Sequence, residues 1–368
     1  MENRTRKNEY KPDSVSPPGS TLRDALEERN MSQRELAERT GHSQKLISQI
    51  IHGKAPLLPE TALELERVLE IPAHFWNNRE RTYRDFLARR EEEAELESQT
   101  GWLENFPLAE MIRYGWMDKL SDPVDQLREV LSFFGIASPA QWQPVWQKRR
   151  VNYRQSTAFE IDDYALAAWL RQGERRAGQM HTAPYDRKDF RAALDDIRAL
   201  TRQPLETFVK RLQEICASCG VAVTYVRQLD RTRVSGATRW LGPDKALIQL
   251  SLRYKKDDHF WFSFFHEAAH VLLHQKTPIF LDEGEGEGEL EEEANEFATK
   301  KLVDQKELRD RFEGRSHISK AEVKEFARQQ DVAPGIVVGQ LHHHGYWDYK
   351  YGQGLIRTLD WSDIEGLC

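Results

Sequence analysis

The sequence is poor in cysteine and contains no long apolar run. Its three cysteines, Cys216, Cys219 and Cys368, are too few for a disulfide framework and favour a reducing compartment. No apolar stretch approaches the roughly 20 residues of a membrane-spanning helix, and the polar N-terminus lacks the apolar core of a signal peptide. We therefore expect a cytoplasmic protein without a membrane partner.

An excess of basic charge is also absent. Lysine and arginine (53 residues) are outnumbered by aspartate and glutamate (60 residues), so the net charge of −7 does not by itself indicate nucleic-acid binding. Hydrophobic residues form 39% and aromatic residues 10% of the chain, which excludes a mostly disordered protein. A length of 368 residues leaves room for two or three cores.

Changes in hydrophobic pattern predict six segments and a fold that is mainly α with an α+β C-terminal domain. The segments are a flexible arm (1–18), a bundle of short helices (19–84), a charged helical connector (85–100), a helical middle region (101–185), the α+β domain (186–345) and a C-terminal tail (346–368). Strand candidates over 221–228, 234–241 and 246–254 predict a small, mainly antiparallel sheet.

The segment 32–53 has the pattern of two short helices joined by a tight turn. Ser32 is a suitable N-cap, and Glu35 is spaced to complete a capping box. Gly41 suits a left-handed turn, and Ser43 is a suitable N-cap for the second helix. This is the pattern of a helix-turn-helix, although an ordinary helical hairpin has the same spacing.

In a helix-turn-helix, the start of the second helix enters the major groove of DNA. Glutamine can bond an adenine edge there, and lysine a guanine edge or a phosphate. We predict five DNA-contacting residues: Gln33, Ser43, Gln44, Lys45 and Ser48.

Three short motifs mark this region: Pro17-Pro18-Gly19, Ile47-Ser48-Xaa-Ile50 and Phe75-Trp76-Xaa-Asn78. Through them, residues 17–84 resemble the Xre-type repressors, and among these the HigA-type antitoxins. The resemblance implies sequence-specific binding to a double-stranded DNA operator, with the protein acting as a homodimer.

Residues 260–274 predict a helix that is apolar on every side and therefore buried. Its centre holds His266, Glu267 and His270, and ionisable groups are costly to bury unless they are paired or bind a metal. The two histidines are four residues apart and so project from one face, as two ligands of one metal ion must. Glu267 is placed to act as the general base that takes a proton from water.

A catalytic Zn2+ ion needs a third protein ligand. The helix predicted over 290–302 follows downstream, and Glu293 borders its apolar face, so we predict Glu293 as this ligand, with Glu292 and Glu296 as alternative registers. The strand over 246–254, if it lies at the sheet edge, would bind an extended substrate by strand addition. The alternative is a site without metal, in which the histidines only pack in the core.

The motifs His266-Glu267-Xaa-Xaa-His270 and Glu293-Ala-Asn-Xaa-Phe-Ala resemble the ImmA/IrrE family of gluzincin-like metallopeptidases, over roughly residues 190–345. The resemblance implies a zinc ligand from the helix of Glu293 and cleavage of a protein such as a repressor. It also implies a stress, prophage, toxin–antitoxin or defence setting. The family usually has glycine where this chain has Ala269, a small-for-small difference that leaves the ligands in place.

These patterns together predict a DNA-binding transcriptional regulator fused to a zinc-dependent endopeptidase, whose substrate is a repressor, a cognate partner or the chain itself. The competing hypothesis is a non-proteolytic, HigA-like antitoxin whose C-terminal domain binds a toxin or a signal. Three further features are predicted to be structural: the Cys216/Cys219 pair as core packing, His342–His344 as a helix end, and the acidic run 282–296 as a solvated loop.

Overall fold

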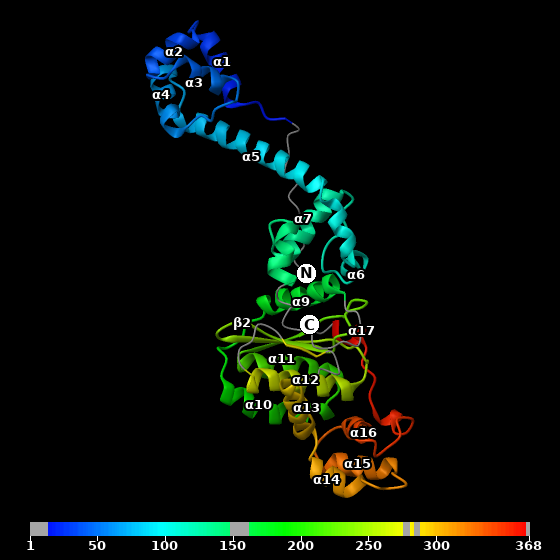
Figure 1. Cartoon of the computed structure of the whole chain (residues 1–368). Coiled ribbons are helices and arrows are strands. Elements are labelled where there is room, and N and C mark those ends of the chain that lie inside the picture. Colours follow the sequence, from blue (N-terminus) through cyan, green and yellow to red (C-terminus); the bar gives the residue numbers. More distant parts are fainter. Residues whose placement is uncertain (1–13, 148–161, 275–279, 283–287, 366–368) are drawn as a thin grey trace. The chain divides into compact units, whose positions relative to one another are not determined.

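The computed structural model describes residues 14–147, 162–274, 280–282 and 288–365 (Figure 1). Most of the predicted flexible arm lies outside the described residues. The described part is mainly helical, which confirms the predicted fold class, and it divides into two compact units, Met1–Thr100 and Gly101–Cys368. Among the described helices, none is long and apolar enough to span a membrane.

The described part of the first unit, from residue 14 onward, contains five helices: α1 (Pro18–Glu28), α2 (Gln33–Thr40), α3 (Gln44–Ile51), α4 (Pro59–Leu69) and α5 (Ala73–Glu97). The predicted N-caps of α2 and α3 are present, because Ser32 and Ser43 each accept a hydrogen bond from the backbone of the third residue that follows. Gly41 ends α2 with a φ of 75°, in the left-handed region that glycine tolerates. These features fix the helix-turn-helix.

Two details of this unit differ from the sequence-based expectation. The Glu35 carboxylate accepts a hydrogen bond from Arg39 at 2.6 Å instead of completing the capping box. The segment predicted as a charged connector is the second half of α5, a single helix whose first turns bury Trp76 in the core and whose later turns are mostly exposed. No break in secondary structure therefore falls at residue 84.

The second unit contains a four-stranded sheet of β1 (Val221–Tyr225), β2 (Gly236–Gly242), β3 (Lys245–Leu250) and β4 (Phe280–Asp282) in the order β1-β3-β2-β4. β1 pairs with β3 in parallel, whereas β2 pairs antiparallel with both β3 and β4. The three predicted strands are confirmed, and β4 was not predicted. β3 has a neighbour on each side, so the condition under which it would bind a substrate by strand addition is not met.

Helices cover both faces of this sheet (Figure 1). The described helices of the second unit are α6 (Leu108–Arg113), α7 (Pro123–Phe134), α9 (Asp163–Gln179), α10 (Arg187–Ala199), α11 (Leu205–Ser218), α12 (Asp257–Leu273), α13 (Glu289–Leu302), α14 (Gln305–Phe312), α15 (Lys320–Gln329), α16 (Pro334–His343) and α17 (Trp361–Glu365). Short 3-10 or π segments are η1 (Thr100–Asn105), η2 (Pro139–Gln141), η3 (Gln143–Gln147), η5 (Leu200–Arg202) and η6 (Gln353–Leu355).

Successive side chains of β3 point to opposite faces of the sheet and so identify the helices that pack on each face. Ile248 and Leu250 belong to the core formed with α10, α11 and α12, whereas Gln249, on the opposite face, donates a hydrogen bond to the Trp169 carbonyl of α9 at 2.7 Å. The Trp169 indole in turn donates to the Val226 carbonyl at 3.0 Å. The middle helical region thus completes the sheet on the face opposite α12.

The predicted C-terminal tail packs against the same unit. Leu359, Trp361 and Ile364 are buried in the core. Upstream of them, the Arg357 guanidinium donates a hydrogen bond of 2.6 Å to the buried carboxylate of Asp257, the first residue of α12. Burial raises the pKa of Asp257, and the hydrogen bond and charge of Arg357 oppose that rise. This contact ties the end of the chain to the start of α12.

Candidate functional site

The centre of α12 contributes the three ionisable residues predicted from the sequence. His266, Glu267 and His270 are buried, because the remaining turns of α12 are apolar and pack into the core between the sheet and α13. The Nε2 atoms of the two histidines lie 3.0 Å apart, as expected for side chains four residues apart on one helical face. The predicted histidine pair is therefore present.

The third member of the cluster is Glu291, on α13. Its Oε2 atom lies 3.1 Å from Nε2 of His266, and its Oε1 atom lies 3.5 Å from Nε2 of His270. The ligand atoms of these three residues all lie within 4.8 Å of one another. Among the described residues, this is the one group of three with the spacing of a metal site.

Glu293, the ligand predicted from the sequence, lies elsewhere. Its side chain is 52% exposed, against 20% for Glu291, and its Oε2 atom is 3.3 Å from Nε2 of His274. The register differs because the face of α13 that contacts α12 is formed by Ala294 and Ala298, three and seven residues after Glu291. The alternative registers do not reach the cluster either, since Glu292 is exposed and Glu296 pairs with Lys300 at 2.5 Å.

Two residues that the sequence analysis did not assign orient the histidine rings. Nδ1 of His266 donates a hydrogen bond to Oδ1 of Asn295 at 2.9 Å, which directs Nε2 toward the cluster. Nδ1 of His270 lies 2.8 Å from Nδ1 of His274. The four-residue spacing of His270 and His274 was the one signal in the sequence for this second contact.

The protonation states of the cluster suit a cation. Burial alone would raise the pKa of Glu291, but hydrogen bonds from His266 and His270 outweigh it and lower the pKa to about 2. Burial lowers the pKa of His270, against the opposing effect of Glu291. An ionised Glu291 and a neutral His270 are the forms in which these two side chains would bind a metal ion.

The donor set and its spacing fit zinc. Zinc binds imidazole nitrogen and carboxylate oxygen at about 2.0–2.2 Å, so the ligand atoms of a tetrahedral site lie roughly 3.3 Å apart. The separations of 3.0, 3.1 and 3.5 Å within the cluster agree with that spacing. A metal ion held by these three residues alone would have a fourth position open, as in catalytic rather than structural zinc sites.

Glu267 is held by β2, beside the cluster and not as a member of it. Its Oε2 atom accepts a hydrogen bond of 2.6 Å from the Thr238 hydroxyl, and the Thr238 hydroxyl also lies 3.0 Å from the Glu267 carbonyl. A Cβ atom at Gly236 would lie 2.6 Å from Oε1 of Glu267, so the glycine leaves the space that the carboxylate occupies. The strand thus fixes the carboxylate in a buried position.

The predicted DNA-contacting residues lie at the start of α2 and along α3, from its N-cap Ser43 to Ser48. Ser43, Gln44 and Lys45 are exposed, and Gln33 and Ser48 are partly exposed. The Ser43 hydroxyl caps α3 by accepting the backbone N–H of Leu46 at 3.2 Å. The side chains of the first turn of α3 are therefore presented to solvent on a capped, rigid helix.

The features that the sequence analysis set aside are mainly structural. Cys216 and Cys219 are free thiols buried in the core, and burial raises the pKa of Cys216 well above its usual value. Nε2 of His342 lies 2.9 Å from the Tyr351 carbonyl, and Nε2 of His344 lies 2.8 Å from Oε1 of Gln305, both at the end of α16. The acidic residues 283–287 lie outside the described residues.

Two parts of the chain match known families. Residues 22–76 match the Helix-turn-helix family, and residues 226–332 match the IrrE N-terminal-like domain family. The chain therefore contains an N-terminal helix-turn-helix domain and an IrrE N-terminal-like, peptidase M78 domain, which confirms the two resemblances predicted from the sequence.

Two solved structures are similar to a part of the chain. One, described as an antidote protein of a plasmid maintenance system from Nostoc punctiforme, is 23% identical with a TM-score of 0.22, over 23% of this chain and 92% of that one. An addiction module antidote protein of a HigA family from Coxiella burnetii is 23% identical with a TM-score of 0.21, over 23% and 91%. No curated protein matches the chain.

Proposed function

We propose, on the premise that the chain joins a helix-turn-helix domain to an IrrE N-terminal-like domain, that it is a transcriptional regulator and a zinc-dependent endopeptidase. It would act in the cytoplasm as a homodimer on a double-stranded operator. Its substrate would be a protein: a repressor, a cognate partner or the chain itself. The observation that carries the peptidase half is the buried cluster of His266, His270 and Glu291 beside the buried carboxylate of Glu267.

In this proposal, the cluster holds Zn2+ and Glu267 is the catalytic base. A zinc ion supplies Lewis acidity, which polarises a peptide carbonyl and makes water acidic enough to lose a proton near neutral pH. The Glu267 carboxylate accepts that proton as water attacks the carbonyl and then passes it to the leaving amine nitrogen. Thr238 and Gly236 support this role, because they hold the carboxylate in one position. Asn295 and His274 orient the two imidazoles.

Metal content tests the peptidase half. We expect about one zinc ion per chain in the wild-type protein, purified without chelators or metal-affinity steps, and loss of that zinc in His270→Ala, because one imidazole ligand is removed. Elemental analysis measures both proteins. No stoichiometric zinc in the wild type, even after reconstitution with zinc, would contradict the proposal and leave the non-proteolytic repressor as the better hypothesis.

The DNA-binding half predicts that α3 determines sequence preference. Selection from random duplexes by the full chain should yield a preferred sequence. Gln44→Ala should then weaken binding by about 1–3 kcal/mol and relax the preference at one base pair, because it removes a base contact. Lys45→Ala should weaken binding to all sequences similarly if it contacts a phosphate. Arg67→Ala, which removes an exposed cation from α4, is the matched control.

Fluorescence anisotropy at two salt concentrations measures these effects. Wild-type affinity in both Gln44→Ala and Lys45→Ala would show that the first turn of α3 is not the DNA-contacting surface. Equal losses in Arg67→Ala would mean that general charge, and not α3, determines affinity.

A further inference from the structure

A cavity of about 460 Å³ lies one residue away from the metal-binding cluster, whose three members do not themselves line it. Its wall includes Asn295, which hydrogen-bonds His266, and Phe262, whose ring centroid lies 6.3 Å from that of His266. Its volume lies within the roughly 300–1,000 Å³ of typical ligand pockets. A peptide bound at the cluster could therefore place one side chain in this cavity.

The cavity combines an apolar wall with acidic groups. Phe262, Leu302 and Ile336 line it together with the carboxylates of Asp258 and Glu292. Its described lining residues include no lysine or arginine, and its basic side chains are the two histidines His259 and His343. Apolar walls that end at a carboxylate match the two parts of a long basic side chain, a methylene stem and a cationic head.

Asp258 is the polar group in the wall that most needs a partner. Its Oδ1 atom is shielded from solvent and has no hydrogen-bond partner among the residues that the structure describes. α16 passes close to it at Gly339, where a Cβ atom would lie 3.0 Å from Oδ2 of Asp258. A shielded carboxylate oxygen without a donor is unfavourable, so a cationic ligand that donates to it would bind with a gain in free energy.

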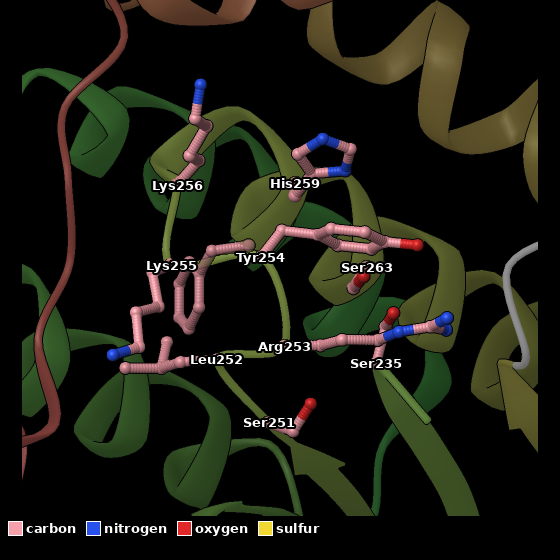
Figure 2. A pocket seen from close by; sticks show the side chains of 10 residues that line it. Ser235, Ser251, Leu252, Arg253, Tyr254, Lys255, Lys256, His259 and Ser263 are labelled. Atoms are coloured by element: carbon pink, nitrogen blue, oxygen red, sulfur yellow. The ribbon is translucent and has the colours of Figure 1, made fainter. Parts of the chain in front are cut away.

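A smaller neighbouring pocket of about 10 Å³ has a different character (Figure 2). It shares Tyr254 and His259, whose rings stack with centroids 4.2 Å apart, with the larger cavity. Its basic residues Arg253, Lys255 and Lys256 do not line the larger cavity. The two pockets therefore differ in charge, and only the larger one has room for a side chain.

We infer that the larger cavity binds a lysine or arginine side chain of the protein substrate next to the bond that is cut, and that Asp258 determines this specificity. The inference rests on the proposed peptidase function. Asp258 would pair with the cationic head, while Phe262 and Ile336 would contact the methylene stem. The substrate class is thus a protein with a basic residue beside the cleavage site.

Binding of small probes to the full chain tests the pocket without any need for turnover. N-acetyl-arginine methylamide is compared with the norleucine and glutamate analogues by NMR saturation-transfer titration. We expect the wild-type protein to bind the arginine probe at least about tenfold more tightly than the norleucine probe. Asp258→Asn should bring the two affinities close together. Glu296→Gln, which removes an exposed charge of α13 that does not line the cavity, should keep the wild-type ratio.

A peptide library then tests the position of the basic residue. The zinc-loaded chain is incubated with peptides of random sequence, and mass spectrometry identifies the cleaved bonds. We expect lysine or arginine to be enriched next to those bonds in the wild type and not in Asp258→Asn. The inference would be overturned if the wild type bound the arginine and norleucine probes equally, or if Asp258→Asn left the ratio of the two affinities unchanged. Cleavage without a preference for a basic residue would also overturn it. Probe binding without any cleavage would overturn the assignment to a substrate, and with it the proposed peptidase.

Discussion

Glu267→Gln is expected to lower peptide cleavage by about 10²–10⁴-fold while leaving the zinc content at the wild-type level. The amide keeps the shape of the side chain but cannot accept a proton from water. It can still accept a hydrogen bond from Thr238, so α12 and the cluster should remain intact. Loss of activity with retained metal would separate the base from the ligands.

The measurement compares cleavage of a peptide pool, or of a substrate found with the wild type, with zinc content on the same samples. Glu289→Gln is the matched control, because it removes an exposed carboxylate at the first residue of α13. Wild-type cleavage by Glu267→Gln would exclude Glu267 as the base. If Glu267→Gln also preserves the biological output of the protein, the non-proteolytic antitoxin hypothesis is favoured.

Glu291→Gln is expected to weaken zinc binding by at least about 100-fold, more than the loss of an outer contact to a ligand. Glu293→Gln is the paired variant and should weaken it by less than roughly tenfold, since Glu293 reaches the cluster only through His274. The two residues lie two positions apart on one helix, so the pair tests the register of α13 directly.

Competition with a chromophoric chelator measures both affinities, and thermal melting checks the fold of each variant. A large loss in Glu293→Gln together with a small loss in Glu291→Gln would reverse the assignment. It would mean that α13 binds metal in the register that the sequence analysis preferred.

The helix-turn-helix could be predicted closely because its determinants are local. Ser32 and Ser43 cap helices within their own turns, and Gly41 adopts the left-handed conformation that its position requires. The histidine pair followed from one helical spacing in the same way. The capping box predicted for Ser32 and Glu35 is incomplete because two local partners compete for the Glu35 carboxylate. It accepts a hydrogen bond from Arg39 and not from the backbone at the start of α2.

The third member of the cluster, Glu291, could not be predicted from the apolar pattern of its helix. The apolar face predicted for this helix comprised Leu290, Ala294, Phe297, Ala298 and Leu302, but Leu290 is 47% exposed. The close contact with α12 is made instead by Ala294 and Ala298, because small residues let two helices approach. Glu291 shares that alanine face. Alanine contributes little to a hydrophobicity profile, although it allows two helices to pack closely.

Contacts between distant segments lay beyond the sequence analysis altogether. Nothing in residues 234–241 marks Thr238 as the partner of Glu267, and nothing in the last residues marks Arg357 as the partner of Asp257. The central position of β3 follows from its parallel pairing with β1, which a linear pattern does not contain. These features depend on topology.

The cover that α9 provides over the sheet bears on how such a protein can be assembled by gene fusion. The hydrogen bonds of Trp169 with Gln249 and Val226 give the sheet a partner that is encoded well before the first strand. A segment cut to the matched residues 226–332 would lack α9 and also β1, α10 and α11, and would leave apolar surface of the sheet exposed. The folded unit that surrounds the site is therefore longer than the matched segment, and the division between the two compact units at residue 100 lies well before it.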